Sequence, residues 1–320
     1  MDRTGMKTIK KLNILLNLAL VVTLLLIVIL TNPYHGDEIV IINLGEKTAH
    51  PSLNISSKKV IYFGFDPRLD PDTEIRIYAP LMSYLSNKTG YEFRLKYEPT
   101  YELVQNDIGM NVTQFAAVGP VSYIVTDLRY GNVVPVAVGL DENKSMFYRA
   151  VIFTRTNLNI TSLSELKGKS FAFGSYYSTQ GHLIPLIMLE EAGVSLKDFR
   201  EYAFLGSHQL CAEAVISGRF DAGAMQDLLA FRLAREGLIK IIAISKPFPR
   251  SLIIANKAVD KNLVENVKKA LIELEPLGSH STLTLWSMTE FPGGFAEPII
   301  EHYTIYYELV EKYLLSGESK

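Results

Sequence analysis

Hydrophobic and polar positions follow two different patterns along this chain. A nearly continuous apolar stretch, residues 12–30, comes first and contains no charged residue. From residue 59 onward, short β-branched and aromatic runs alternate with stretches in which apolar residues recur every three or four positions. Alternating strand and helix patterns are typical of α/β proteins, in which crossover helices connect largely parallel strands. The sequence therefore predicts a membrane-length segment followed by an α/β fold.

The apolar stretch has close to the ~20 residues that a helix needs to cross a bilayer. It is longer than the ~7–15-residue core of a secretory signal, and neither a small-residue cleavage site nor a lipobox cysteine follows it. Residues 1–11 carry a net charge of +3, which favours the cytoplasmic side. We interpret residues 1–36 as a basic cytoplasmic N-terminus and an uncleaved transmembrane signal anchor, and residues 37–58 as a tether. A cleaved signal peptide is the alternative.

The strand and helix patterns that follow form two blocks. The first block has predicted strands at residues 60–65, 92–97, 114–118 and 133–140 and helices at residues 74–88 and 121–130. The second has predicted strands at residues 170–174, 202–205, 220–225 and 239–245 and helices at residues 179–192, 207–217 and 227–236. Extended segments connect the blocks in both directions, the first of them a predicted strand at residues 147–155. We expect lobe 1 to comprise residues 59–147 and 248–320 and lobe 2 to comprise residues 148–247, with a ligand cleft between them.

Charge and cysteine content exclude several classes of function. After the first eleven residues the chain sums to −5 and has no Lys/Arg run, so nucleic-acid binding is not expected. Cys211 is the single cysteine, which excludes an intramolecular disulfide and a cysteine metal cluster. The six histidines show no HExxH spacing, so no metal or other cofactor is expected. Cys211 follows His208 by three residues, which would suit a thiolate–imidazole pair, but a small buried side chain is the interpretation we favour.

Candidate chemistry is concentrated where predicted strands end and helices begin. In residues 171–185 an apolar strand ends at Gly174, and Ser178 and Thr179 begin a helix, followed by Gln180 and Gly181. The first N–H groups of a helix lack intrahelical partners and lie at the positive end of its dipole, so an anion is stabilised there. The two hydroxyls can add hydrogen bonds. Ser178 acting only as an N-cap is the alternative.

Two further segments repeat this arrangement. Residues 204–209 place His208 at another helix start, and residues 116–123 place Tyr123 after a Gly-Pro turn. Two helix ends and an imidazole facing one cleft would suit a tetrahedral oxyanion. A histidine at a helix start is otherwise structural or solvated, and a buried tyrosine is often a core residue with a polar tip.

The order of these motifs resembles a known family. The segments that carry the resemblance are residues 64–65 (GF), 118–123 (VGPVSY), 163–169 (LSELKGK), 178–185 (STQGHLIP), 206–208 (GSH) and 221–224 (DAGA). Over about residues 59–275 the chain is similar to the phosphate/phosphite/phosphonate-type periplasmic binding proteins of ABC transporters. The resemblance implies an α/β, two-lobed type II periplasmic-binding fold with a hinged central cleft.

The resemblance also implies ligand-binding residues. Ser178, Thr179 and His208 match the family's phosphonate-oxygen ligands, and Tyr123 and Tyr101 match cleft tyrosines of lobe 1.

Other matching positions concern ligand groups other than the phosphonate oxygens. Asp227 resembles an acidic residue that binds a ligand's amine. Gln180, which we include among the ligand-binding residues, and Gln209 stand where the family often has Ser and Asp. Arg250 lies near a position that is acidic in aminophosphonate binders; a cation there opposes an amine and favours a second anionic group, and a solvated hinge residue is the alternative.

We therefore expect a single-pass protein of the cell membrane with its C-terminal domain outside, in the periplasm or another extracytoplasmic space. It would capture a phosphonate-type or related small oxyanion, bind it without turnover, and deliver it to an ABC permease and its ATPase. A membrane-anchored sensory ectodomain that passes ligand occupancy to a signalling partner is the alternative, and an enzyme is less favoured.

Overall fold

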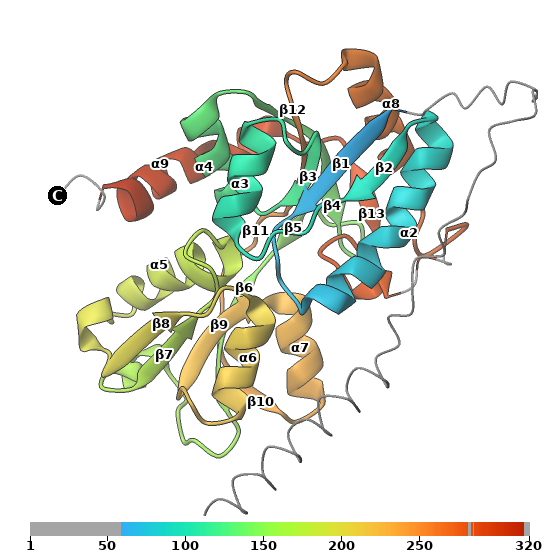
Figure 1. Cartoon of the computed structure of the whole chain (residues 1–320). Helices are drawn as coiled ribbons and strands as arrows, with labels where there is room; N and C mark the ends of the chain where they lie inside the picture. The colour runs from blue at the N-terminus through green and yellow to red at the C-terminus, as the bar shows by residue number, and fades with distance from the viewer. Residues whose placement is uncertain (1–58, 281–282, 284, 317–320) are drawn as a thin grey trace, which may run out of the picture. The chain divides into compact units, whose positions relative to one another are not determined.

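The computed structural model describes residues 59–280, 283 and 285–316. They belong to one compact unit, Ser57–Lys320, built around two sheets (Figure 1). The predicted membrane anchor and tether lie outside the described residues, and within the described part of the chain no helix has both the length and the apolar character needed to span a bilayer. The predicted α/β alternation of strands and helices is confirmed from Val60 onward.

The first sheet, with its helices, is called lobe 1. Its six strands lie in the order β13-β4-β12-β3-β1-β2. Strand β1 pairs in parallel with β2 and β3, whereas β12 runs antiparallel between β3 and β4. The strands are β1 Val60–Phe65, β2 Glu92–Leu95, β3 Phe115–Val118, β4 Val133–Leu140, β12 Leu252–Asn256 and β13 Gly294–Ala296.

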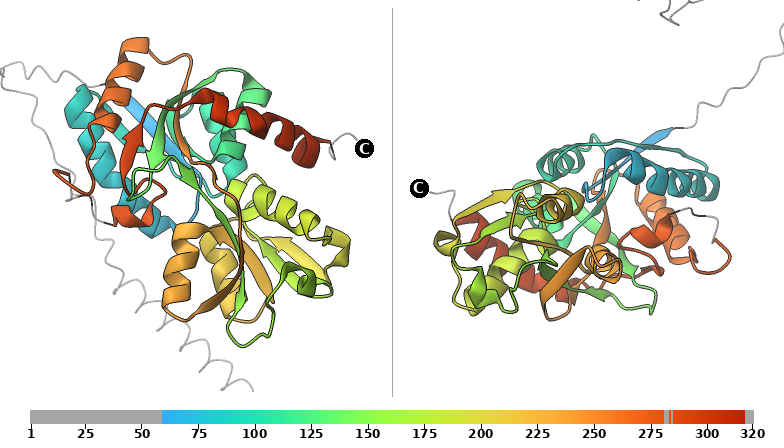
Figure 2. Two further views of the ribbon diagram at one scale, coloured as in Figure 1. Left: turned by 180° about the vertical axis from the view of Figure 1, so that it is seen from behind. Right: turned by 90° about the horizontal axis from the view of Figure 1, so that it is seen from below.

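Helices cover both faces of the lobe 1 sheet, which explains why the central strand β3 is apolar at every position. Helix α2 packs on α8, while α3 packs on α4 and α4 on α9. Figures 1 and 2 show α9 beside α4. The helices are α2 Pro71–Thr89, α3 Tyr101–Gly109, α4 Pro120–Tyr130, α8 Lys261–Ile272 and α9 Thr304–Val310, with short turns η4 Trp286–Met288, η5 Ile300–Tyr303 and η6 Glu311–Leu315.

The second sheet, with its helices, is called lobe 2. Its strands lie in the order β10-β6-β9-β7-β8, with β7 parallel to β8 and β9 and with β6 antiparallel to β9 and β10. The strands are β6 Ala150–Arg155, β7 Ser170–Phe173, β8 Glu201–Phe204, β9 Ala222–Gln226 and β10 Ile239–Ile244. The helices are α5 Ile184–Glu191, α6 His208–Ile216 and α7 Asp227–Arg235, with short turns η1 Leu163–Leu166, η2 Thr179–Leu183 and η3 Leu196–Asp198.

Two crossover segments connect the lobes and are hydrogen-bonded to each other. Strand β5 (Phe147–Tyr148) pairs antiparallel with β11 (Phe248–Pro249). The sequence pattern predicted one strand over residues 147–155; the structure divides it at Arg149, because β5 pairs with the other crossover and β6 with the lobe 2 sheet. The crossovers therefore form a small sheet of their own between the lobes.

The predicted helix at residues 179–192 begins as a wider, π-helical turn. Pro185 has no N–H, so it cannot donate the usual bond to the carbonyl of Gly181. That carbonyl instead accepts a 2.8 Å bond from the N–H of Gly174, at the end of β7. A regular α-helix then follows over Ile184–Glu191. The proline thus fixes the loop between β7 and the helix at the position where Ser178 and Thr179 lie.

Candidate functional site

A small cavity lies between the two lobes. The volume open to the centre of a water-sized sphere is about 10 Å³, room for about one water molecule. Both lobes contribute to its wall, and its lining is almost entirely polar. The lining residues are Arg68, Tyr101, Gly119, Tyr148, Ser178, Thr179, Gln180, His208, Ser251 and Glu290.

Four helix N-termini converge on this cavity. Tyr101 is the first residue of α3, Gly119 caps α4, Ser178 caps the η2–α5 helix, and His208 is the first residue of α6. Each helix start carries N–H groups without intrahelical partners and the positive end of the dipole. Two starts come from each lobe, so the positive ends of helix dipoles face a ligand held here from both sides. This arrangement favours an anion.

The predicted hydroxyl pair, Ser178 and Thr179, lines the cavity, and both side chains are almost fully buried. The Ser178 Oγ accepts a 2.9 Å bond from the N–H of Gly181, so it is an N-cap, as in the alternative interpretation. The Thr179 Oγ1 accepts a 3.0 Å bond from the N–H of Val121, across the lobes. Each hydroxyl keeps its own proton for donation to a further acceptor.

His208, also predicted, supplies a polar atom that lacks a partner. Its ring is 2% exposed, and its Nδ1 makes no hydrogen bond to any described residue. Burial, with a smaller contribution from the charge of Arg68, lowers the pKa of His208 to about 3. The imidazole is therefore neutral at physiological pH and can donate from one nitrogen. A buried polar atom without a hydrogen-bond partner destabilises the folded protein, and a hydrogen bond to a ligand oxygen would offset that cost.

Tyr148, in the first crossover, supplies a second buried polar atom without a hydrogen-bond partner in the described part of the chain. It is buried, lines the cavity, and its Oη makes no hydrogen bond of normal geometry, although the Thr179 and Tyr306 side chains lie near it. Tyr101, the predicted cleft tyrosine of α3, lines the cavity as well. Hydroxyl donors from three separate segments therefore face the same small space.

Sequence reasoning missed a buried charge cluster at this site. The Arg68 Nε lies 3.0 Å from the Glu290 Oε1, and its Nη1 donates a 3.1 Å bond to the carbonyl of Asp66. The Ser251 hydroxyl donates to the other carboxylate oxygen of Glu290. Arg68 lies three residues after the end of strand β1, so the strand-end argument applied to the other motifs would have found it. Glu290 lies just after the short turn η4, far along the chain, where no pattern marked it.

Asp66 is the third charged member of this cluster. Its carboxylate accepts bonds from the Gly119 N–H (2.8 Å) and the Ser122 hydroxyl (2.9 Å). Burial raises the pKa of Asp66 to about 7, and the charge of Arg68 opposes that rise. The carboxylate holds the start of α4 in place, which positions Gly119 in the cavity wall.

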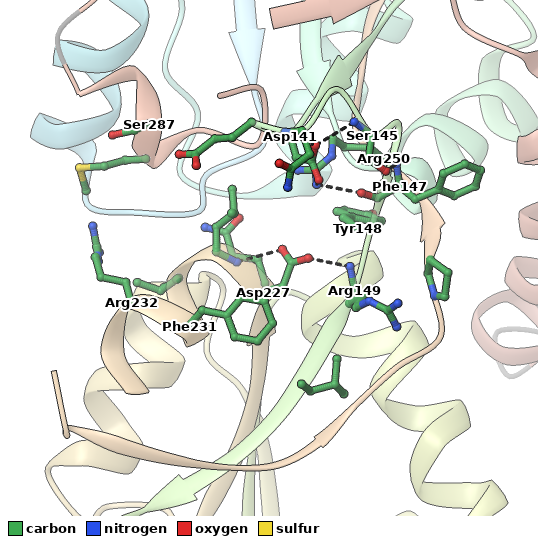
Figure 3. A pocket seen from close by; sticks show the side chains of 18 of the residues that line it. Asp141, Ser145, Phe147, Tyr148, Arg149, Asp227, Phe231, Arg232, Arg250 and Ser287 are labelled. Carbon is green, nitrogen blue, oxygen red and sulfur yellow. Dashed lines mark hydrogen bonds and ion pairs between the residues drawn. The ribbon is translucent and has the colours of Figure 1, made fainter. Parts of the chain in front are cut away.

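Three predicted residues lie away from the cavity wall. Tyr123 belongs to the core of lobe 1, where its ring centroid is 6.2 Å from that of Tyr303. Asp227 and Arg250 line a larger neighbouring cleft of about 850 Å³, measured in the same way as the cavity. Figure 3 shows this cleft, with Asp227 on one side and Arg250 among the residues opposite it.

Asp227 is held by the backbone around it. Its carboxylate accepts bonds from the N–H groups of Arg149 (2.8 Å) and Leu228 (2.9 Å). Burial raises its pKa, and the nearby charge of Arg250 opposes that rise.

Arg250 joins the two crossovers instead of facing solvent. Its Nη2 donates to the carbonyl of Phe147 (2.8 Å) and its Nη1 to that of Glu290 (3.0 Å). The side chain is 2% exposed, so the interpretation of Arg250 as a solvated hinge residue is wrong. The guanidinium is part of the buried structure that connects the two crossovers.

Cys211 lies in the interior, as favoured from the sequence. It is fully buried, and its Sγ donates a 3.0 Å bond to the carbonyl of Ala172. Burial raises the pKa of the thiol to about 12, so it stays protonated. Among the described residues no group of three or more His, Cys, Asp or Glu side chains is arranged to hold a metal ion.

Comparison with known proteins places these features in a family. A model of the family described as "ABC transporter, phosphonate, periplasmic substrate-binding protein" matches residues 63–297. A probable ABC transporter phosphite-binding protein, PhnD1 of Prochlorococcus marinus, is 31% identical over 180 residues, which are 53% of this chain and 59% of that protein. The phosphate-import protein PhnD of Mycolicibacterium smegmatis is 27% identical over 207 residues, 60% of this chain and 64% of that protein. The matches thus span about three fifths of each relative.

A solved structure shows the same fold. The structure of PhnD1 from Prochlorococcus marinus in complex with methylphosphonate matches with a TM-score of 0.73 at 21% identity, covering 79% of this chain and 98% of that one. The predicted α/β fold of the periplasmic-binding-protein kind is thereby confirmed.

Proposed function

We propose a function from one premise: the chain belongs to the family of periplasmic substrate-binding proteins of phosphonate ABC transporters. It captures a compact phosphorus oxyanion between its lobes and releases it, unchanged, to an ABC importer. The observation that carries this proposal is the convergence of four helix N-termini on one buried cavity, where the Nδ1 of His208 lacks a partner.

Binding proceeds through hydrogen bonds to the oxyanion oxygens. The hydroxyls of Ser178 and Thr179, the neutral imidazole of His208 and the N–H groups at the helix starts are the donors from lobe 2. Tyr101 and the start of α4 close from lobe 1. Because the cavity has room for about one water molecule, the lobes or the lining side chains must separate for the ligand to enter. Ligand contacts made only when the lobes are together would stabilise the closed state.

The relatives support the ligand class. One is named for phosphite, one for phosphate import, and the solved structure contains methylphosphonate. All three molecules are small, tetrahedral and anionic. The cavity is small too, so we propose phosphite, phosphate or methylphosphonate rather than a phosphonate with a long substituent.

The proposal also includes the membrane anchor, the location of the lobes and the partner proteins that the sequence predicts. Residues 12–30 would anchor the chain in the cell membrane, with the two lobes, hinged in the type II manner, on the extracytoplasmic side. The partners would be an ABC permease and its ATPase, and no catalysis would occur.

Calorimetric titration of the purified protein with methylphosphonate, phosphite, phosphate, sulfate and 2-aminoethylphosphonate tests the function. The informative variant is His208→Phe. The hydroxyls of Ser178 and Thr179 also accept hydrogen bonds from backbone N–H groups, so their removal would disturb the structure, whereas the His208 Nδ1 makes no hydrogen bond within the described residues. We expect tight binding of a phosphorus oxyanion, weakened about 10- to 100-fold in His208→Phe, the value of one hydrogen bond to a charged group.

The matched control is His182→Phe, which removes a buried imidazole that does not line the cavity. It should bind as the unaltered protein does. A folded protein that binds none of the five anions would contradict the proposed function.

A further inference from the structure

Two hollows of very different size lie next to each other between the lobes. The cavity has a volume of about 10 Å³ and the neighbouring cleft about 850 Å³. Tyr148 lines both, so its ring is a shared wall. Gln180 lines the cavity, whereas Arg149 and Asp227 line the cleft.

The side chain of Gln180 spans the remaining distance between them. Its Nε2 donates a 2.7 Å bond to the carbonyl of Arg149 and a longer, 3.4 Å bond to the Oδ1 of Asp227. Asp227 is itself fixed by the N–H groups of Arg149 and Leu228, so the acceptors of the amide are held in place. Gln180 is 2% exposed, so these hydrogen bonds hold its side chain in the interior, between the cavity and the cleft.

We propose that the Gln180 side chain, together with the ring of Tyr148, is the partition that restricts the oxyanion cavity to ligands whose substituent is no larger than a methyl group. The inference rests on the proposed function, since it assumes that a phosphorus oxyanion occupies the cavity. A shorter residue at position 180 would connect the cavity with the cleft, and the substituent of a longer phosphonate would then lie beside Tyr148 and Asp227.

The cleft can receive such a substituent. Its lining mixes apolar and charged side chains, including Phe147, Phe231, Asp227 and Arg149 (Figure 3). The cleft therefore offers apolar as well as charged surface, and a neutral alkyl chain brings no charge of its own that would need a partner there. n-Propylphosphonate is the probe of choice, because it differs from methylphosphonate only by two methylene groups and tests size without testing charge.

The experiment is a calorimetric titration of the full chain and three variants with methylphosphonate and n-propylphosphonate. Gln180→Ser and Gln180→Ala shorten the side chain, while Gln180→Met removes the amide but keeps most of the volume. In the unaltered protein n-propylphosphonate should bind at least tenfold more weakly than methylphosphonate. In Gln180→Ser and Gln180→Ala this ratio should fall at least tenfold, whereas Gln180→Met should keep it.

The outcomes separate this inference from the function on which it rests. If the unaltered protein binds neither phosphonate, the proposed function fails and the partition with it. If it binds both equally well, or if the shortened variants bind methylphosphonate and keep the original ratio, only the partition is contradicted. Loss of all binding in both shortened, folded variants would also contradict it and would favour the ligand-binding role predicted for Gln180 from the sequence, because the partition assigns the Gln180 amide to Arg149 and Asp227 instead of the oxyanion.

Discussion

At the scale of single residues, burial determines which protonation state a side chain presents. His208 and His182 both lie in the interior of lobe 2, and both are neutral at physiological pH. His182 makes a 2.7 Å hydrogen bond with the carbonyl of Tyr176 through its Nδ1 and packs against the rings of Phe173 and Phe204. Burial lowers its pKa to about 4, and the hydrogen bond opposes that change.

This shift predicts a pH dependence of stability. The unfolded chain binds a proton at His182 near pH 6.5 and the folded chain only near pH 4, so stability is fully present above pH 6.5 and is lost as the pH falls to about 4. His182→Phe should lack this loss, so its free energy of unfolding, relative to the unaltered protein, should rise by about 3 kcal/mol between pH 7 and pH 4. Urea unfolding of both proteins at several pH values measures this difference in unfolding free energy. Parallel pH profiles would rule the assignment out.

Which site residues were predictable from the sequence depended on where they lie along the chain. Ser178 and Thr179 follow the buried strand β7 after a short loop, and His208 follows the edge strand β8 in the same way, so the strand-to-helix pattern brought them together. Tyr123 follows a strand as well, but it occupies the fourth position of α4, and its side chain enters the core instead. Glu290 reaches the site through tertiary packing alone, because no strand of the structure immediately precedes it.

At the scale of elements, the helix that carries His208 depends on close packing against lobe 2's sheet. Helix α6 lies against β9 with Cys211 directly over Gly223. A Cβ at Gly223 would lie 2.7 Å from the Cys211 Sγ and 2.9 Å from the carbonyl of Ala172. A side chain at position 223 would therefore move α6 away from the sheet.

Gly223→Ala should consequently lower the free energy of unfolding by about 1–3 kcal/mol, the usual cost of overpacking a core. It should also weaken oxyanion binding, because the displaced helix carries His208 with it. Gly64→Ala is the matched control in another strand, where the nearest atom to a new Cβ, the Thr113 Cγ2, is 3.5 Å away. Chemical denaturation compares the two. Equal stabilities would show that α6 does not require the glycine.

The fold was predictable at this scale wherever the local pattern was complete. Strand β4 was predicted at its observed bounds, residues 133–140, and α4 ends at the predicted residue, Tyr130. The pattern did not reveal β11 or β13, which are only two and three residues long and exist because a partner strand is present. Pairing between distant segments leaves no periodic signal in so short a run.

At the scale of the described two-lobed unit, a few contacts hold the lobes together. Gln209 of α6 reaches lobe 1 twice: its N–H donates to the carbonyl of Arg68, and its Oε1 accepts from the N–H of Asp70, each at 3.1 Å. The Thr179–Val121 bond is a third such contact. None of these bonds would survive a separation of the lobes, so each contributes to the closed state alone.

Gln209→Ala removes the side-chain contact and should therefore weaken oxyanion binding about 3- to 10-fold, the value of one neutral hydrogen bond. Glu213→Ala is the matched control, because Glu213 accepts a 2.9 Å bond from the Gln209 Nε2 and belongs to the same helix. Titration calorimetry of both variants gives the comparison. An unchanged affinity in Gln209→Ala would mean that the Gln209 side chain contributes nothing to closure.

The pairing of β5 with β11 has a kinetic consequence. Two independent crossovers would allow the lobes to slide and twist as well as to swing apart. Here the crossovers are hydrogen-bonded to each other, and Arg250 connects them a second time, so they must bend together. Under the proposed function, separation of the lobes would therefore have to bend both crossovers at once, and a bound anion could leave only during that motion. The residence time of the ligand would then depend on how often the two crossovers bend, rather than on how quickly any single hydrogen bond breaks.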